Sequence, residues 1–546
     1  MLDELSEYYA DFLDGTYDCV DRIVLNGYFR LGQSPGGFRT WGRSLEGSDD
    51  NLDNAHLMRM AGRLSRRVRA HAKAHQIPLL DCAQGERKHE LAEEHLPKDP
   101  AFVGVFLILV GRAPAPVWDV VRSKSGTISN IARKTPMPYV NHYSFHIMDS
   151  EWGHITIKLC GHPPFGAQII LNGHEYVARQ AKKEGLEFTK EENCFTHVSD
   201  AARLAQVADT LCSPNIIGRL SQVCERWIYS ACVCFALDLA EQEKTGFHYD
   251  YSVYQGEYSR NLLFKRGSEM EQVVQGIVER TRQPLEVKTV KTIFGTRRRP
   301  SRRRGRKAPR CEVVVERPTY DLTVFKIHFG KLTVKLYTKG EHVLRIEVII
   351  HNAKEMPCGR ALPKFSEIVS RLKGILTRFL NVVRCIDVAC IGEARLDELP
   401  TPSPVGQSRG GGVDINQPGR RVVVEAVMAL SPAPQGFSCS ELAAKVREIT
   451  QGEYTSRQAA YDLKKLRGKN VVRKVGASRR YETMGEGLQN IATLLVLREK
   501  VIKPVLAGAG KPRRGPKPRH QSAIDAHYET IQVEMRNLFQ TIGIAA

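Results

Sequence analysis

The chain has 546 residues, of which 42% are hydrophobic and 26% are charged, a composition that excludes wholesale disorder and a fibrous repeat. At roughly 100–200 residues per domain, this length predicts about three or four domains. Lys and Arg outnumber Asp and Glu by 80 to 60, which gives a formal net charge of +20 and favours nucleic acid as a partner.

Two further features of the composition bear on the compartment. No apolar run approaches the roughly 20 residues of a membrane-spanning helix, so no membrane partner is expected. The N-terminal sequence MLDELSEYYADFL is acidic and lacks the basic start and apolar stretch of a secretory signal. The 13 cysteines are odd in number and form no CxxC pair, so neither a disulfide framework nor a zinc knuckle is indicated. These features predict a cytoplasmic protein with reduced thiols.

The N-terminal segment, residues 1–125, alternates predicted strands and helices. Residues 20–29 and 102–110 have the apolar character of strands, and residues 56–77 have helical periodicity with an apolar face and many arginines elsewhere. The basic face of this helix is either solvated or a contact for nucleic acid. Asp21, at the head of the first strand, is a candidate metal carboxylate if the N-terminal strands share a site with later ones.

The second segment, residues 126–295, contains a predicted hairpin over residues 142–160. Alternation places Tyr143, Phe145 and Ile147 opposite Ile155, Ile157 and Leu159 on an apolar face. The other face is rich in histidine and is a candidate to hold a divalent metal or to line a nucleic-acid channel. The alternative is a plainly solvated face. The residues of this second candidate site are His142, His146 and His154, with Asp149 in or beside the turn.

A basic run of Arg, Lys and Pro, residues 296–310, predicts an extended arm that binds phosphates or a minor groove, or else a solvated linker. Its candidate DNA-binding residues are Arg297, Arg298, Arg299, Arg302, Arg303 and Arg304.

The next segment, residues 311–399, contains three predicted antiparallel strands between residues 320 and 352, with turns at Gly330 and Gly340. The predicted register pairs Leu336 with Leu344, Val334 with Ile346 and Leu332 with Val348, which buries one face. The opposite face then carries Lys, His, Arg, Glu and Tyr side chains.

The polar face of these strands contains KLYTKGE followed by LRIEV. This pair of motifs resembles the Tyr-x-Lys and Arg-x-Glu hairpin of rolling-circle replication initiators. The resemblance implies that Tyr337 is a nucleophile that nicks DNA, that Lys339 and Arg345 clamp phosphate, and that Glu347 is a metal ligand. His328 lies on the same predicted face and is a further candidate ligand, with Mg²⁺ or Mn²⁺ as the expected ion. The alternative is a cross-strand packing role for the tyrosine.

Residues 400–418 are rich in Pro, Ser and Gly and predict a flexible linker. In residues 419–507 an apolar helix over 422–430 is followed by a second helix capped by Ser438 or Ser440, by a third over 455–469 and by a basic hairpin with Gly476 at its turn. This order resembles the winged helix-turn-helix family, which implies a recognition helix in a DNA major groove. The alternative is a domain used only for protein contacts. The candidate DNA-binding residues are Arg457, Gln458, Tyr461, Lys464, Lys465, Lys474, Arg479 and Arg480.

Residues 508–546 are predicted to be a second basic arm and a C-terminal helix. The whole chain is therefore predicted to be a multidomain α+β protein, in which antiparallel sheets with packed helices precede a winged helix. The chain also resembles uncharacterised proteins of bacterial mobile elements, which implies a nucleoid-associated location. Three functions remain open: a metal-dependent strand-nicking transposase or replication initiator, a non-catalytic DNA-binding regulator, and an RNA-binding or RNA-guided factor. The sequence leaves the oligomeric state open.

Overall fold

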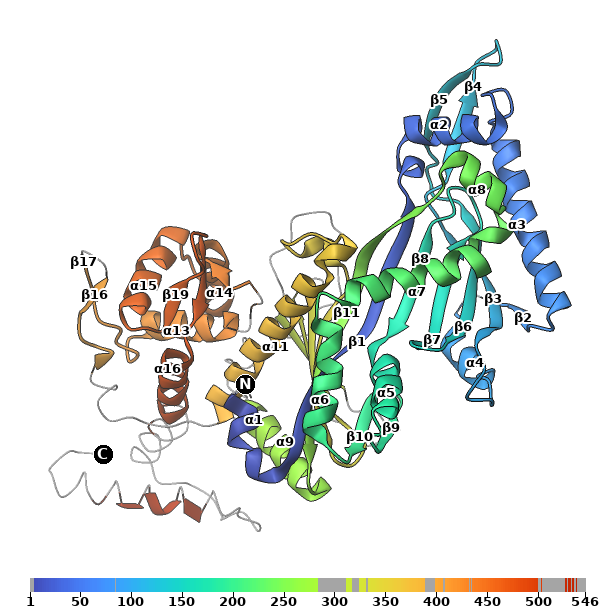
Figure 1. The fold of residues 1–546 in the computed structure, drawn as a ribbon. Helices are drawn as coiled ribbons and strands as arrows, with labels where there is room; N and C mark the ends of the chain where they lie inside the picture. The colour runs from blue at the N-terminus through green and yellow to red at the C-terminus, as the bar shows by residue number, and fades with distance from the viewer. Residues whose placement is uncertain are drawn as a thin grey trace, which may run out of the picture. The chain divides into compact units, whose positions relative to one another are not determined.

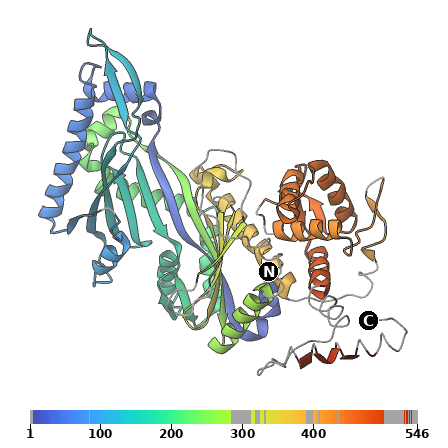
Figure 2. The same cartoon turned by 180° about the vertical axis from the view of Figure 1, so that it is seen from behind.

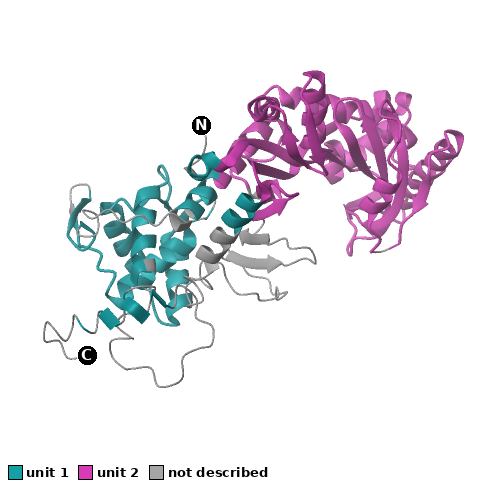
Figure 3. Ribbon diagram, turned by 90° about the horizontal axis from the view of Figure 1, so that it is seen from below, with its two compact units in different colours: residues 1–11, 268–330, 377–546 teal, residues 12–267, 331–376 magenta. Residues whose placement is uncertain are grey.

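The structure is a computed structural model. It describes residues 4–83, 85–282, 311–316, 324–329, 332–387, 398–405, 408–431, 433, 435–498 and 502, and also residues 526, 527, 529–531, 533, 534 and 537. The chain divides into two compact units (Figure 3), and each is described by itself. Unit 1 comprises residues 1–11, 268–330 and 377–546, and unit 2 comprises residues 12–267 and 331–376.

Unit 2 is built on one large sheet, in which the strand order is β14-β15-β11-β1-β8-β7-β6-β3-β2. Neighbouring strands are antiparallel except for β2 and β3, which are parallel. The strands are β1 Leu13–Phe29, β2 Leu79–Asp81, β3 Gly104–Pro114, β6 Tyr139–Asp149, β7 Gly153–Cys160, β8 Ala167–Asn172, β11 Tyr249–Phe264, β14 Leu332–Lys339 and β15 Val343–Ile350.

Helices pack on both faces of this sheet. Helix α7 crosses in front of the strands in Figure 1 and lies behind them in Figure 2. Phe235, just after α7, stacks on Phe145 of β6 with ring centroids 6.1 Å apart, so the contact at this point is apolar. The helices of unit 2 are α2 Pro35–Glu46, α3 Asn54–Ala74, α4 Lys88–Glu94, α5 Gly173–Lys183, α6 Ala201–Asp209, α7 Ile216–Ala231 and α8 Leu239–Thr245.

Helix α11, Phe365–Asp387, begins in unit 2 and packs over β11. A Cβ atom on Gly256 would lie 3.6 Å from Leu372 of this helix, and Lys373 lies 3.7 Å from Asp18 of β1. Because side chains alternate along a strand, Tyr258 and Arg260 face α11, whereas their neighbours on β11 face the other way. Two small hairpins complete the unit: β4 Trp118–Arg122 with β5 Ile128–Arg133, and β9 Phe188–Glu191 with β10 Cys194–Val198.

Unit 1 contains a cluster of helices around a small sheet with the strand order β18-β20-β19. Helices α14 and α15 each begin with a capping box, formed by Ser438 with Glu441 and by Thr455 with Gln458, which satisfies N–H groups that the first turn leaves unpaired. The elements are α13 Pro418–Leu430, β18 Phe437–Ser438, α14 Cys439–Thr450, α15 Ser456–Gly468, β19 Val472–Lys474, β20 Arg480–Thr483 and α16 Gly485–Leu497. Unit 1 also contains α1 Glu4–Tyr8, most of α9 Gly267–Arg282, the hairpin of β12 Cys311–Glu316 with β13 Val324–Phe329, and the pair β16 Ser403–Val405 with β17 Ser408–Gly410.

The mixed α/β architecture and the largely antiparallel sheet are confirmed. The histidine hairpin has the predicted apolar face, on which Tyr143 lies opposite Leu159 and Phe145 opposite Ile157. The predicted helix at 56–77 is α3, and the strands predicted at 20–29 and 102–110 are β1 and β3.

Two expectations are corrected. The register of β14 and β15 differs by two residues from the predicted one, because Leu336 pairs with Ile346 and Val334 with Val348 around a turn at Gly340, which has φ +58°. A shift of two keeps every side chain on its predicted face. In addition, one sheet combines strands from the segments 1–125, 126–295 and 311–399, which the sequence analysis separated, since β1 pairs with both β8 and β11, and β11 pairs with β15.

Candidate functional site

One face of the sheet carries polar side chains across four adjacent strands, β14, β15, β11 and β1. This face is the one opposite α11. Cross-strand pairing aligns these side chains in two rows. The first row is Tyr337, Arg345, Asn261 and Tyr17, and the second is Lys335, Glu347, Ser259 and Cys19. The rows bring together residues that lie more than 300 positions apart in the sequence.

Asp21 is the centre of this polar face. A register shift between Val20 and Ile23 bulges β1 at this point. The Asp21 side chain is 1% exposed, and its Oδ1 accepts a hydrogen bond from Ser259 Oγ at 3.0 Å. Its Oδ2 is paired with the guanidinium of Arg345, which is itself fully buried. Although burial opposes ionisation most strongly, Arg345 and then His174 hold the pKa of the Asp21 carboxyl below its ordinary value.

His174 approaches Asp21 from the first turn of α5. The helix begins at Gly173, where a Cβ atom would lie only 1.8 Å from the carbonyl oxygen of Val20, so only glycine allows α5 to start this close to β1. Nδ1 of His174 lies 2.8 Å from Oδ1 of Asp21, and the imidazole is 0% exposed. Burial lowers the pKa of His174 in spite of Asp21, so the ring is neutral at pH 7.

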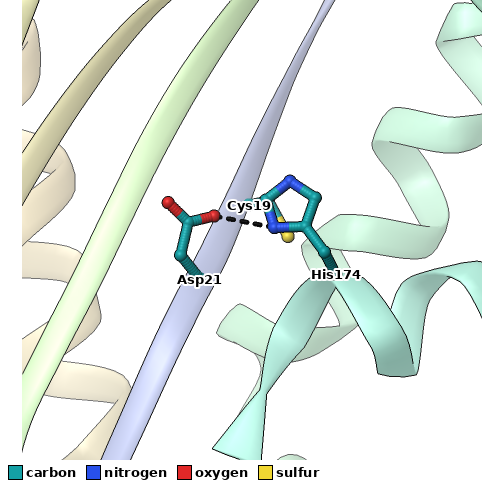
Figure 4. Close-up of side chains that lie close together, drawn as sticks. All are labelled: Cys19, Asp21 and His174. Carbon is teal, nitrogen blue, oxygen red and sulfur yellow. Dashed lines mark ion pairs between the residues drawn. The ribbon is translucent and has the colours of Figure 1, made fainter. Parts of the chain in front are cut away.

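Cys19 completes a group that could hold a metal ion. Figure 4 shows Cys19, Asp21 and His174 close together, and one ligand atom from each lies within 4.8 Å of the other two. The Cys19 thiol is fully buried, and this burial, followed by the charge of Asp21, raises its pKa well above the ordinary value. Without a metal ion, the group therefore contains an anionic carboxylate, a neutral imidazole and a protonated thiol.

The structure places two of the predicted catalytic and metal-binding residues beside Asp21. Arg345 Nη1 donates to the carbonyl oxygen of Asn193 at 2.6 Å, and its Nη2 lies 3.5 Å from Oε1 of Glu347. Glu347 is 2% exposed and pairs with Lys335 at 3.0 Å. Arg345 and Glu347 are thus both buried, and both form ion pairs or hydrogen bonds within the protein.

The two remaining predicted residues of this hairpin lie at its edge. Tyr337 is half-buried opposite Arg345, and burial raises its pKa above the ordinary value of 10.0, an effect that Arg345 only partly offsets. The phenol is therefore neutral at pH 7. Lys339 forms an ion pair with Glu192.

Glu257 of β11 is the carboxyl group of this face that titrates near neutrality. Burial, followed by the nearby charges of Glu347 and Asp21, raises its pKa to about 7. It accepts a hydrogen bond from Gln255 Nε2 at 2.7 Å.

The histidine-rich face of β6 and β7 is covered rather than solvated. His146 is 5% exposed, its Nδ1 lies 3.0 Å from Nε2 of His154, and Phe106 packs against both rings at centroid distances of 6.1 and 5.2 Å. Burial, followed by the neighbouring His154, lowers the pKa of His146 to about 3. Burial, followed by Lys158, lowers the pKa of His142 to about 4.

Asp149 does not share the histidine face. Its side chain lies on the α7 side of the hairpin, where it accepts hydrogen bonds from Trp227 Nε1 and Arg226 Nη1, both at 2.8 Å. It also accepts from the backbone N–H groups of Glu151 at 2.8 Å and Trp152 at 2.9 Å. Asp149 therefore closes the turn between β6 and β7.

The predicted DNA-binding residues of unit 1 fall into two groups. Arg457, Tyr461, Lys474 and Arg479 are exposed, and Lys464 is half-buried. The other three bind partners within the domain. Lys465 is only 7% exposed, with Nζ 4.0 Å from Asp462, and Arg480 donates to the carbonyl of Gly436 and to Glu441. Gln458 is exposed and caps its own helix.

Some predicted residues lie outside the described part of the chain. These include the basic arm at 296–310, with Arg297, Arg298, Arg299, Arg302, Arg303 and Arg304, and nearly all of the segment 508–546. The backbone of His328 is described within β13, where it pairs with Glu312, but its side chain is not.

Asp21 was a candidate from the sequence, whereas its neighbours Cys19 and His174 were not. The spacing of Cys19 and Asp21 was an available signal, because residues two apart on a strand share a face. His174 gave no such signal, since only the pairing of β1 with β8 brings α5 to this point.

In the part of the chain that the structure describes, no helix is long and apolar enough to cross a membrane. No protein-family model, curated protein or solved structure matches this chain.

Proposed function

We propose that this chain is a DNA-binding protein and that residues 418–497 form a winged helix-turn-helix that contacts duplex DNA. The observation that carries the proposal is the order of elements: helix α13, strand β18, helices α14 and α15, then the hairpin of β19 and β20. In proteins of this class the third helix enters the major groove and the hairpin lies beside it.

The exposed residues of α15 and the hairpin support this proposal. Arg457 lies in the first turn of α15, and Tyr461, one turn further on, is 58% exposed. Lys474 and Arg479 flank the turn at Gly476, which has φ +54°. Arginine and lysine at these positions provide donors for phosphates and for base edges.

The packing of α15 also leaves the side of the helix that carries Arg457 and Tyr461 open to a partner. Ala459, Leu463 and Leu466 are at most 1% exposed and fix one side of the helix against the domain core. Arg457 and Tyr461 are consequently left on the side turned away from that core.

Replacement of Arg457 by alanine is expected to weaken duplex binding by about 1–3 kcal/mol, which is roughly 5- to 150-fold in Kd. The measurement is fluorescence anisotropy of the full chain with duplexes selected from a random pool, repeated at several salt concentrations. Loss at one base position marks a base contact, and uniform loss with a shallower salt dependence marks a phosphate contact.

Arg371→Ala is the matched control for charge, because Arg371 is an exposed arginine on α11 that pairs with Glu367. Equal loss of binding in Arg457→Ala and Arg371→Ala would contradict a reading surface on α15. Single-stranded DNA and RNA of the same sequence are measured in parallel. Preference for RNA would replace the DNA proposal by an RNA-binding function.

A second candidate function is metal-dependent nicking of DNA by a transposase or replication initiator of a mobile element, with Mg²⁺ or Mn²⁺ as cofactor. The observation that favours it is the position of Tyr337, Arg345 and Glu347 on one face of the sheet, beside Asp21. The neutral, half-buried phenol of Tyr337 would have to be exposed and deprotonated on binding DNA before it could attack phosphorus.

If Tyr337 is the nucleophile, the full chain incubated with DNA and Mg²⁺ or Mn²⁺ forms a denaturation-resistant adduct that Tyr337→Phe abolishes. Binding to duplex DNA is expected to stay unchanged in this variant, because Tyr337 lies in unit 2 and α15 in unit 1. Tyr254→Phe on β11, another half-buried tyrosine, is the matched control. DNA binding without any adduct would leave the chain as a non-catalytic regulator.

A further inference from the structure

We propose that Cys19, Asp21 and His174 bind one zinc-type divalent cation that holds strand β1 to helix α5. This inference goes beyond the proposed function, since it concerns unit 2 and does not depend on DNA binding. The three side chains offer a thiolate, a carboxylate oxygen and an imidazole nitrogen within 4.8 Å of one another.

One buried nitrogen of His174 has no partner among the described residues. The ring is 0% exposed, and Nδ1 is paired with Oδ1 of Asp21 at 2.8 Å, whereas Nε2 has no hydrogen-bond partner. Buried polar side-chain atoms are nearly always satisfied by protein, water or ligand. A buried neutral imidazole has one unprotonated nitrogen, which is a common donor to a metal ion.

Hydrogen bonds and an ion pair hold the Asp21 carboxylate in one orientation. Arg345 takes Oδ2, so Oδ1 is the oxygen that faces His174. Ser259 donates to Oδ1 at 3.0 Å, and Asn261 Nδ2 in turn donates to Ser259 Oγ at 3.2 Å. Carboxylate ligands of metal ions are characteristically oriented by such a second layer of hydrogen bonds.

The donor set decides the class of ion. Thiolate and imidazole ligands suit zinc and similar transition metals, whereas Mg²⁺ and Ca²⁺ prefer oxygen ligands. In a tetrahedral zinc site with bonds of about 2.0–2.3 Å, ligand atoms lie roughly 3.5 Å apart. The present separations of up to 4.8 Å therefore require only a small contraction.

Binding also changes the charge of the group. The Cys19 thiol loses its proton to become a ligand, so one cation binds as one proton leaves. All three side chains are at most 1% exposed, which excludes access of a substrate to the ion in this conformation. The three side chains fill three of the four positions of a tetrahedral ion, and their burial keeps a substrate from the fourth, so we assign the ion a structural role and infer that it enters as the protein folds.

The test uses the full chain, unfolded under reducing conditions, refolded with Co²⁺ or Zn²⁺ and freed of loose metal. We expect one ion per chain by elemental analysis and, with Co²⁺, a thiolate-to-cobalt charge-transfer band in the near ultraviolet. Cys19→Ser is expected to lose the band. Cys224→Ser keeps it, because Cys224 is an equally buried thiol on α7.

Ser259→Ala provides a milder variant in case Cys19→Ser fails to fold. Loss of an orienting hydrogen bond typically weakens metal affinity about 10- to 100-fold, measured by competition with a chelator, while circular dichroism reports the fold. An unchanged cobalt band in folded Cys19→Ser would overturn the proposal. Absence of bound metal and of the band in the refolded wild-type chain would overturn it as well, whatever the variants do.

Discussion

Asp21→Ala is expected to lower the free energy of unfolding by about 3–5 kcal/mol, because it leaves the buried guanidinium of Arg345 without its main partner. Arg345 is 0% exposed, so water cannot replace the carboxylate. Glu347, at 3.5 Å from Arg345, already pairs with Lys335 and compensates only in part.

Chemical denaturation followed by tryptophan fluorescence measures this effect in unit 2, because the chain's four tryptophans lie at positions 41, 118, 152 and 227. Glu367→Ala, which breaks the exposed pair with Arg371 on α11, is expected to cause no measurable change. The double variant Asp21→Ala/Arg345→Met should recover part of the loss, since a buried ion pair replaced by apolar side chains is often neutral. An unfolding midpoint for Asp21→Ala equal to that of the wild type would contradict the buried pair.

The second large effect is a loss of stability in mild acid that arises from the covered histidines. The pKa of His146 is about 3 in the folded chain, against an ordinary 6.5. Below pH 6.5 this histidine binds a proton in the unfolded chain but not in the folded chain. The free energy of unfolding is therefore unaffected by this group above pH 6.5 and falls as the pH decreases towards 3. At pH 5, His146 alone is expected to lower the free energy of unfolding by roughly 2 kcal/mol.

The surroundings of His146 reinforce this direction. His154 and Lys88 face it and disfavour a further positive charge. Lys158 and Lys88 do the same to His142, whose pKa of about 4 adds a similar loss. Glu175, which faces His154, favours protonation there but does not overcome burial.

The comparison is between the free energies of unfolding at pH 7 and pH 5. His146→Gln should reduce the difference by roughly 2 kcal/mol, because glutamine keeps a polar group beside His154 and does not titrate. His89→Gln serves as the control, since the His89 side chain is 70% exposed. The same pH dependence in wild type and His146→Gln would show that the histidine is not protonated on unfolding in this range.

Local pattern was sufficient to assign the faces of strands whose partner is the next one along the chain. In the hairpin of β6 and β7, alternation determined which side chains lie on the apolar face, because a one-residue slip would have moved Phe145 and Ile157 from that face. In β14 and β15 the same alternation gave the correct faces, but the turn at Gly340 set a register two residues away from the predicted one. Periodicity cannot distinguish registers that differ by two residues.

In the same way, the sequence predicted helix α14 with a cap at Ser438 or Ser440, helix α15 and the basic hairpin after them, since caps, helix ends and turns depend on neighbouring residues. It also marked Arg457 and Arg479, which are exposed. The engagement of Lys465 with Asp462 and of Arg480 with Glu441 depends on packing between elements, which an amphipathic pattern does not specify.

Only the tertiary structure brought Cys19, Asp21 and His174 together with Arg345. These residues come from β1, the start of α5 and β15. They meet because β11 pairs with both β1 and β15, and because β8, which leads directly into α5, pairs with the other edge of β1. The sequence by itself determined the alternation of faces, the helix caps and the positive charge, which are local or summed properties. Strand order between distant segments depends on which long-range pairings bury the most apolar surface at once, and one chain's local pattern does not contain that choice.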